Sequence, residues 1–514
     1  MKSKRFLPQL TRSEACCFLL AGVLRLGLAA FFHPGHPSGN AAVTGTFAVW
    51  GGDTFSYLDP IENLLRHGIY AQDLARLDTY AGRMPGYGAV YGLLRLVAGP
   101  GTAADGVMVL QLLLSLASVY ALGRLAQAVT QRPVAFQWAV LLYGASTFAI
   151  TFDIRLLTES FATSALIIGI YWLHQAHRQP LPTHAWWLGA GLWLGWAVFL
   201  RPFLAPWFGL VIVSHAAWAL TGNGGSGRRR LHAFRTVLLA LPFLVADGVW
   251  VARNWPWYHR VVPVQSSYWA GYQTPPGFRA LDDFVGTIGE EPLYWEPARD
   301  ISWFYKPLTD PAPNFRGETS KLAPPAYTYD SLLLVRRYLL VAQDDTRPPA
   351  FRRAAEARAS RALNRYSRAY RQLRPFHAFV LVPLKLMYRL TLAHPGDYLF
   401  RQPFAELVAW KKVVKAGAHL WYLVIVGLGL IGTFFVGWRP HFVELLVKSV
   451  PVYLIVLLCV VLFKVEFRYF AVAYPFVLIG TVDVLLAGRE LVKRKRLAIP
   501  TTSPESTSPV RTAS

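Results

Sequence analysis

The feature that most constrains this chain is a series of apolar runs, each close to the length of a membrane-spanning helix. An α-helix needs about 20 predominantly apolar residues to cross the hydrocarbon core of a bilayer, and only 16% of the 514 residues are charged. Because backbone polar groups in lipid must be satisfied within the spanning structure, we predict an all-α polytopic membrane protein with about ten transmembrane helices. The apolar runs are residues 14–33, 105–127, 133–151, 157–174, 184–200, 203–220, 233–252, 417–437, 446–463 and 469–487.

The charges between these runs predict how the chain is oriented. The basic start MKSKRFLPQLTR and the basic connectors GRLAQAVTQRP and TGNGGSGRRRLHAFR fall on one side, which the positive-inside rule assigns to the cytoplasm. The first run has no small-residue cleavage site, so we interpret it as an anchor rather than a signal peptide. We therefore expect a bacterial inner-membrane protein whose first loop faces the periplasm or exterior. The net charge of +23 predicts contacts with anionic lipids rather than with nucleic acid.

The composition also predicts how the chain is divided. A long outer segment precedes the last three spans, and within it the run 379–393 is interpreted as interfacial, because a crossing there would put the basic C-terminus outside. The predicted parts are an N-terminal transmembrane catalytic module at 1–252 with a first outer loop at 34–103 that carries interfacial helices, the outer segment at 253–415, C-terminal transmembrane helices at 416–487, and a disordered Ser/Thr/Pro-rich cytoplasmic tail at 488–514.

One stretch of the outer segment, residues 351–374, has the pattern of a basic amphipathic helix. At helical spacing one face carries Arg358, Arg361, Arg365 and Arg368, and the other carries Leu363, Tyr366, Tyr370 and Leu373. Such a helix suits a membrane surface. We interpret it as resting on anionic lipid head groups, with the alternative that it holds an anionic glycolipid or polymer.

Charged residues at membrane depth are costly and are therefore functional candidates. The predicted topology brings a set of them, from several connectors, to the outer face. They are Asp53, Arg83, Asp153, Arg155, Glu159, Arg201, Arg253, Glu466 and Arg468. Guanidinium groups suit phosphate because each can donate two parallel charge-assisted hydrogen bonds. A phosphate at a membrane surface usually belongs to a lipid, and the sequence has no P-loop or Gly-rich nucleotide fingerprint. We therefore expect a lipid phosphate rather than a nucleotide as the ligand.

Some of these residues also have purely structural interpretations. Asp53, in FAVWGGDTFSYLDP, precedes a predicted helix and is either an N-cap or a general base towards a hydroxyl, with Tyr57 one turn later on the same face. Glu159 opens an apolar helix, where the helix dipole by itself favours an acid. Glu466 and Arg468 are close enough in sequence to pair with each other. The cysteines lie in apolar runs and have no disulfide or zinc spacing.

The order of the motifs resembles that of the GT-C glycosyltransferases, in particular the bacterial relatives of dolichyl-phosphate-mannose protein mannosyltransferases and of the lipid A aminoarabinose transferase. The resemblance covers about residues 14–275 and 416–487. It rests on GDTFSY, LLRHGIYAQD, RMPGY, LLTES, FLRPF, VARNWPWYHRVVPVQSSYWAGY and EFRYFAVAYPF, which occur here in that order.

The resemblance implies an inverting hexosyl- or pentosyltransferase at the outer face of the membrane. The enzyme would move a sugar from a polyprenyl-phosphate carrier to a hydroxyl of a glycolipid, polysaccharide or protein. In that family the first-loop aspartate acts as or supports the catalytic base, a role that falls to Asp53. Glu159 matches a second acid, with Asp153 as its alternative. The matching phosphate-binding positions are Arg83, Arg201, Arg253 and Arg468, and we add Tyr57, Tyr87 and Asn254 as candidate substrate-binding residues.

Two features stay open at this point. Some members of the family use a divalent metal and others do not, and no histidine cluster lies near Asp53 in the sequence. The alternative functions are a transporter or flippase of lipid-linked saccharides, and a polymerase or ligase of surface polysaccharide. A transporter should line a path through the membrane with charges, whereas the charges here gather at span ends on one side.

Overall fold

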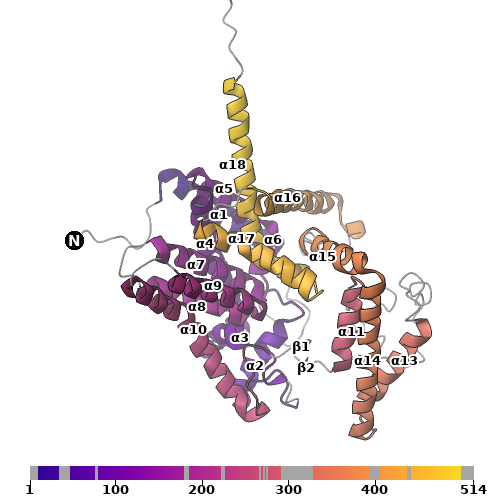
Figure 1. Ribbon diagram of the computed structural model, residues 1–514. Coiled ribbons are helices and arrows are strands. Elements are labelled where there is room, and N and C mark those ends of the chain that lie inside the picture. The colour runs from indigo at the N-terminus through magenta and orange to yellow at the C-terminus, as the bar shows by residue number, and fades with distance from the viewer. Residues whose placement is uncertain are drawn as a thin grey trace, which may run out of the picture.

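The computed structural model describes most of the chain as helix (Figure 1). The described residues are 10–33, 47–75, 79–178, 184–221, 226–265, 268–269, 272–273, 276–290, 328–393, 400, 404–436 and 441–498. The N-terminal part consists of α1 (Arg12–Phe32), α2 (Thr54–His67), α3 (Pro85–Arg95), α4 (Pro100–Thr130), α5 (Val134–Gly144), α6 (Thr147–Asp153), α7 (Thr158–Arg178), α8 (His184–Leu200), the 3₁₀ helix Pro202–Leu204, α9 (Ala205–Thr221) and α10 (Ser226–Tyr258).

The rest of the chain is also mainly helical. It comprises the antiparallel pair β1 (Tyr268–Trp269) and β2 (Tyr272–Gln273), then α11 (Pro276–Thr287), α13 (Tyr329–Gln343), α14 (Pro349–Leu373), the π-helix His377–Leu381, α15 (Val382–Thr391), the 3₁₀ helix Phe404–Glu406, α16 (Ala409–Phe434), α17 (Phe442–Ile455), the π-helix Val456–Val461, the 3₁₀ helix Phe467–Val472 and α18 (Tyr474–Ala498). In the β pair, Tyr268 is opposite Gln273 and Trp269 is opposite Tyr272.

Each predicted span coincides with helix, and the prediction of an all-α polytopic membrane protein is confirmed. The predicted number of ten crossings is not confirmed. Among the described residues, five helices are long and apolar enough to cross a membrane, or six if the pair α5 and α6, bent by 59°, is one span. The five are Arg12–Phe32, Pro100–Thr130, Arg229–Tyr258, Ala409–Phe434 and Phe442–Val461. The central helix α7 is buried along most of its length and carries Thr, Ser and Glu side chains, which lowers its hydropathy.

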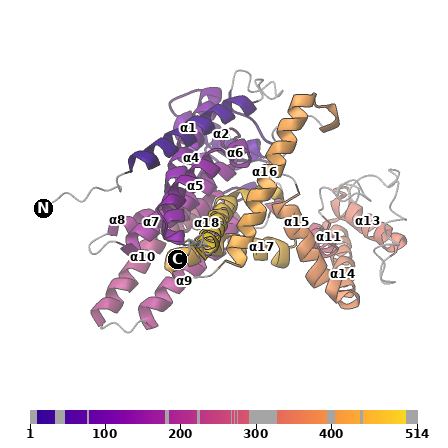
Figure 2. The same cartoon turned by 90° about the horizontal axis from the view of Figure 1, so that it is seen from above.

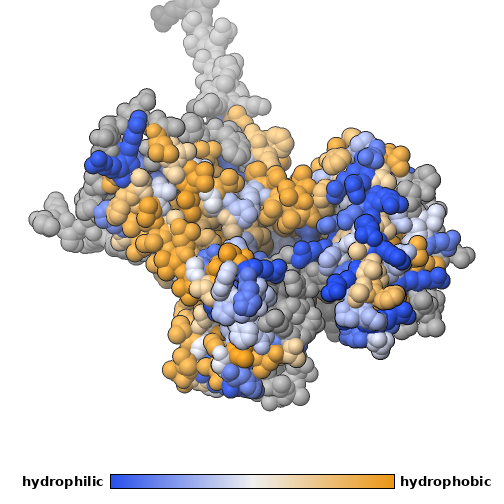
Figure 3. All heavy atoms as spheres, turned by 60° about the horizontal axis from the view of Figure 1, so that its bottom comes forward, coloured by the Kyte–Doolittle hydropathy of each residue, from blue (hydrophilic) through white to orange (hydrophobic). Residues whose placement is uncertain are grey.

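The outer segment contains a helical lobe beside the main bundle, formed by α11, α13 and α14 (Figures 1 and 2). Its core includes Phe284 of α11, Leu332 of α13 and Leu363 of α14. In Figure 3 hydrophilic residues cover much of this lobe, whereas hydrophobic residues dominate the visible surface of the bundle. The lobe therefore has its own core and a polar exterior.

The amphipathic pattern at 351–374 is confirmed as α14, but its apolar face has a different partner from the expected one. Leu363, Tyr366 and Tyr370 are buried against α11 and α13, while Leu373 is 59% exposed. The apolar face therefore does not lie on a membrane surface, because the lobe already covers it. The arginines at 358, 361, 365 and 368 are all exposed, so their contact with anionic head groups stays a prediction.

The run 379–393 contains the ten-residue helix α15, which is too short to be a span and is consistent with the interfacial interpretation. One other boundary differs from expectation. Helix α18 continues to Ala498, so residues 488–498 are not part of a disordered tail, because the stretch GRELVKRKRLA is rich in helix-forming residues. The predicted disorder of residues 499–514 lies outside the described residues.

Candidate functional site

Asp53 is held in place because its loop is tied to the start of α7. Val49 forms an isolated parallel β-bridge with Arg155, and a Cβ on Gly51 would lie 3.1 Å from the Leu157 side chain. Such a close approach explains the first glycine of the GGD sequence. Asp53 takes the N-cap position of α2, but its side chain makes no capping hydrogen bond. The N-cap alternative therefore does not account for the carboxylate.

The Asp53 carboxylate faces two guanidinium groups instead. Its Oδ2 atom lies 2.6 Å from Nη1 of Arg468, and its Oδ1 atom lies 3.9 Å from Nη2 of Arg83. Arg83 donates from Nε to Ser56 Oγ at 3.0 Å and lies 4.6 Å from the centre of the Tyr57 ring. Burial raises the pKa of Asp53, but the positive charges of Arg468 and Arg83 lower it by more, so its pKa lies below the ordinary value. Asp53 is therefore ionised at neutral pH.

Arg468 connects three carboxylates. Besides Asp53, its Nε atom lies 2.8 Å from Glu466 and 3.7 Å from Glu159. The interpretation that Glu466 and Arg468 pair only with each other is therefore wrong. Arg201 forms a second ion pair with Glu159, and both of these side chains are buried. The network joins the start of α2, the start of α7, the end of α8 and the 3₁₀ helix before α18.

The two candidate acids, Asp153 and Glu159, have different contacts. Asp153 forms a buried ion pair with Arg25 at 2.7 Å and accepts hydrogen bonds from Ser115 at 2.9 Å and Ser160 at 2.6 Å. This arrangement satisfies the Asp153 carboxylate inside the helix bundle. Glu159 is the acid that shares a guanidinium with Asp53.

A cavity of about 480 Å³ opens beside this network. Its lining residues are Tyr57, Arg83, Met84, Tyr87, Thr158, Phe199, Leu200, Arg201, Pro202, Phe203, Gln265, Leu462 and Tyr469. The predicted residues Tyr57, Tyr87, Arg83 and Arg201 thus come together, from segments far apart in the sequence. The size lies within the range of about 300–1,000 Å³ that is typical of small-molecule sites.

Arg253 and Asn254 are not among the described residues that line this cavity, and neither are Asp53, Glu159 and Arg468. The Arg253 guanidinium donates to the backbone carbonyl groups of Tyr70 and Tyr80 and to Asn254 Oδ1. Asn254 is fully buried. The pair fastens the end of α10 to the first loop, which contains Arg83, and its role is to support the cavity wall.

Sequence reasoning missed one prominent member of the site. The Tyr469 ring lies 5.4 Å from the Arg201 guanidinium and 5.8 Å from that of Arg468. An aromatic face stabilises a cation in this position. Its position in the sequence could have indicated this role, because Tyr469 directly follows the candidate Arg468 in EFRYF.

The acids of the site are engaged by arginines rather than arranged around a cation position. Over the described residues, no group of three or more His, Cys, Asp or Glu side chains could hold a metal ion. The described acids therefore do not form a recognisable metal site.

Comparison with known proteins finds one protein-family match, which covers part of the chain. Residues 88–268 match the Alg9-like mannosyltransferase family, and the predicted resemblance to GT-C glycosyltransferases is confirmed. No curated protein sequence matches the chain.

Among solved structures, the apo oligosaccharyltransferase of Archaeoglobus fulgidus is similar at 13% identity and a TM-score of 0.48, over 94% of this chain and 51% of that one. The oligosaccharyltransferase AglB of the same organism, in complex with an inhibitory peptide and a dolichol-phosphate, is similar at 14% identity and a TM-score of 0.46, over 96% of this chain and 52% of that one. The chain thus spans about half the length of these enzymes.

Proposed function

We propose that this membrane glycosyltransferase of the GT-C type transfers a sugar from a polyprenyl-phosphate carrier to an acceptor hydroxyl, with inversion at the anomeric carbon. The acceptor is a glycolipid, a polysaccharide or a protein, and the sugar is a hexose or a pentose. The reaction takes place at the end of the bundle that contains Asp53, which we assign to the periplasmic or outer face.

The observation that carries this proposal is the Asp53 carboxylate in a charge network whose members Arg83 and Arg201 line a cavity large enough for a sugar phosphate. Asp53 contacts Arg468 through Oδ2 and lies 3.9 Å from Arg83 through Oδ1. The second distance exceeds a hydrogen bond, so Oδ1 is the oxygen suited to accept a proton. Arg83 and Arg201 line the cavity and are suited to hold a phosphate.

The proposed reaction is a direct displacement. Asp53 takes the proton of the acceptor hydroxyl as its oxygen forms a bond to the anomeric carbon of the sugar. The bond between that carbon and the phosphate oxygen breaks, and its electron pair stays on the polyprenyl phosphate. Arg83 and Arg201 stabilise the negative charge that develops on the leaving phosphate. General base assistance contributes about 10²–10⁴-fold to the rate, and preorganised cations contribute through charge stabilisation.

An apolar groove next to the cavity supports a lipid as the carrier. The groove, of about 540 Å³, runs between α9 and α17 and reaches Val461, the neighbour of cavity residue Leu462. Tyr453 of the groove donates a hydrogen bond of 2.6 Å to the carbonyl oxygen of Phe203, which lines the cavity. A ligand with its phosphate at the arginines can therefore extend a hydrocarbon chain along this groove.

The test is to incubate the purified full-length protein with polyprenyl-phosphate sugars and a panel of acceptors, and to measure the released polyprenyl phosphate. The proposal expects release that depends on an acceptor. Reconstituted vesicles separate this activity from transport. Movement of the intact lipid-linked sugar across the bilayer without release of polyprenyl phosphate would instead indicate a flippase.

A further inference from the structure

We propose that a second cavity, at the opposite end of the bundle from Asp53, binds the phosphate headgroup of an anionic lipid. The two sites lie at opposite ends of α7. The catalytic network includes Glu159 in the first turn of α7, whereas the second cavity includes Arg178, the last residue of α7. Arg178 follows Glu159 by 19 positions, which corresponds to about 28 Å of helix, so the second cavity lies near the other membrane surface.

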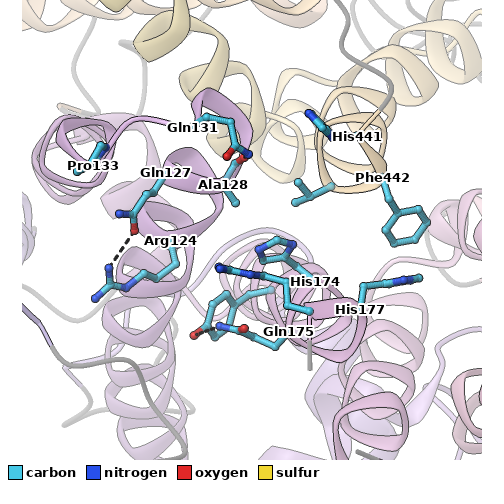
Figure 4. Close-up of a pocket in the computed structure, with 13 residues that line it drawn as sticks. Arg124, Gln127, Ala128, Gln131, Pro133, His174, Gln175, His177, His441 and Phe442 are labelled. Atoms are coloured by element: carbon cyan, nitrogen blue, oxygen red, sulfur yellow. Dashed lines mark hydrogen bonds between the residues drawn. The ribbon is translucent and has the colours of Figure 1, made fainter. Parts of the chain in front are cut away.

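The second cavity is formed by the ends of three helices and has a volume of about 660 Å³. Side chains from the end of α4, the end of α7 and the start of α17 surround it (Figure 4). Its lining residues are Arg124, Gln127, Ala128, Gln131, Pro133, Tyr171, His174, Gln175, His177, Arg178, His441, Phe442 and Val443. This wall is rich in groups that donate hydrogen bonds.

The charges of this cavity favour an anion. Its described lining residues include two arginines and three histidines and no carboxylate. Arg124 is paired with Glu14 at 3.0 Å, so the pair is neutral overall. Arg178 is exposed and adds a positive charge. Phosphate oxygens can accept hydrogen bonds from guanidinium, imidazole and carboxamide groups together.

The start of α17 adds to this preference. The first residues of a helix have backbone N–H groups without intrahelical partners, and the helix dipole favours negative charge there. His441 is the N-cap of α17 and makes no side-chain capping hydrogen bond. Phe442 and Val443, the first two residues of the helix, line the cavity, so these amide groups lie at its wall.

A lipid is the favoured source of the phosphate because the cavity continues into an apolar surface. Phe442 lines both this cavity and the groove between α9 and α17. From Phe442 to Val461 the groove follows 20 residues of helix, a length of about 30 Å. An amphiphile with its phosphate at Arg178 can therefore place a hydrocarbon chain in the end of the groove next to Phe442, opposite the Val461 end that we assign to the carrier.

The proposal is tested by native mass spectrometry of the full-length protein in detergent, titrated with phosphatidylglycerol and, separately, with zwitterionic phosphatidylcholine. We expect phosphatidylglycerol to bind about tenfold more tightly. Arg178→Gln should weaken this binding about tenfold, the usual effect of losing one charge-assisted hydrogen bond, and His441→Ala should weaken it by a smaller factor. Arg66→Gln, which removes an exposed arginine from α2, is the matched control and should have no effect. Equal melting temperatures of the variants establish that their fold is intact.

A parallel titration with inorganic phosphate separates the two sources of the ligand. Phosphate that displaces phosphatidylglycerol supports recognition of the headgroup. Phosphate that binds in an Arg178-dependent manner while phosphatidylglycerol does not would support a phosphate site filled from solution and overturn the lipid as the source. Equal affinity for both lipids, or affinity that is unchanged in both Arg178→Gln and His441→Ala, would overturn the site itself. The readout is binding, so it does not depend on the proposed transfer reaction.

Discussion

Arg468 and Asp53 come from opposite ends of the chain, yet the Arg468 Nη1 atom lies 2.6 Å from the Asp53 Oδ2 atom. This contact connects the last part of the helix bundle to the first loop. It also leaves the two oxygens of Asp53 in different environments, because Oδ1 lies 3.9 Å from the Arg83 guanidinium. The catalytic proposal rests on this difference between the two oxygens.

Arg83 and Arg253 should respond differently to the loss of their charge. Arg83→Gln removes a guanidinium that lines the cavity, so we expect kcat/KM for the lipid donor to fall about 10- to 100-fold, the effect of one or two charge-assisted hydrogen bonds. Arg253→Gln removes contacts to the carbonyl groups of Tyr70 and Tyr80 and should mainly lower the melting temperature. Steady-state kinetics and thermal unfolding of both variants check this. If both variants lost donor affinity to the same extent, Arg253 would have to be counted among the phosphate-binding residues.

The buried pair of Arg201 and Glu159 should be sensitive to the loss of one partner. Their side chains are 8% and 0% exposed, and removing one member of such a pair costs about 3–5 kcal/mol. Arg201→Gln should therefore lower the melting temperature by several degrees. Arg66→Gln is the control, because Arg66 is 66% exposed in its pair with Glu62, and a surface pair contributes about 0–1 kcal/mol. Similar melting temperatures for the two variants would argue against a buried charge network.

Asp59 should make the stability depend on pH. Burial, followed by the nearby charge of Glu62, raises the pKa of Asp59 to about 6, whereas an unfolded aspartate titrates near about 3.9. The folded state therefore favours the protonated form of Asp59. The contribution of Asp59 to the free energy of unfolding is present at low pH and is lost as the pH rises through about 6. Asp59→Asn should match the wild type near pH 4 and melt at a higher temperature near pH 7. Melting curves across this range test the sign, and a variant that is less stable at pH 7 would contradict it.

Close packing of α16 against α18 should not tolerate a methyl group at Gly432. A Cβ there would lie 2.1 Å from the carbonyl oxygen of Gly480. Overpacking of this kind typically costs about 1–3 kcal/mol, so Gly432→Ala should lower the melting temperature. Gly427→Ala, in the same helix, is the control, because nothing lies within 4 Å of its added Cβ, and it should be neutral or stabilising. Thermal unfolding of the two proteins in detergent distinguishes these outcomes.

The sequence identified the helices and several cavity residues because their signals are local. Apolar runs indicate spans directly. Arg83 and Arg201 stand at breaks between predicted helices, and Tyr57 lies one turn after Asp53 on a predicted helix. The choice between Asp153 and Glu159 depended on partners that no local pattern reveals, since Arg25, Ser115 and Ser160 come from three separate helices.

Local sequence patterns also did not reveal the tertiary partners of Arg253 and of helix α14. Arg253 looked like a phosphate ligand because it emerges from a span, and only the fold brings the carbonyl groups of Tyr70 and Tyr80 against it. An amphipathic pattern shows that α14 has an apolar face, but it does not distinguish a membrane from two neighbouring helices as the partner.

The central claim is that Asp53 is the base in sugar transfer, and replacing its carboxylate by an amide tests it most directly. The measurement is the rate of polyprenyl phosphate release by Asp53→Asn under saturating donor and acceptor, with Asp59→Asn as a control from the same first loop. We predict a loss of at least about 10²-fold for Asp53→Asn, with donor binding retained and the control fully active. Wild-type turnover by Asp53→Asn would contradict the account.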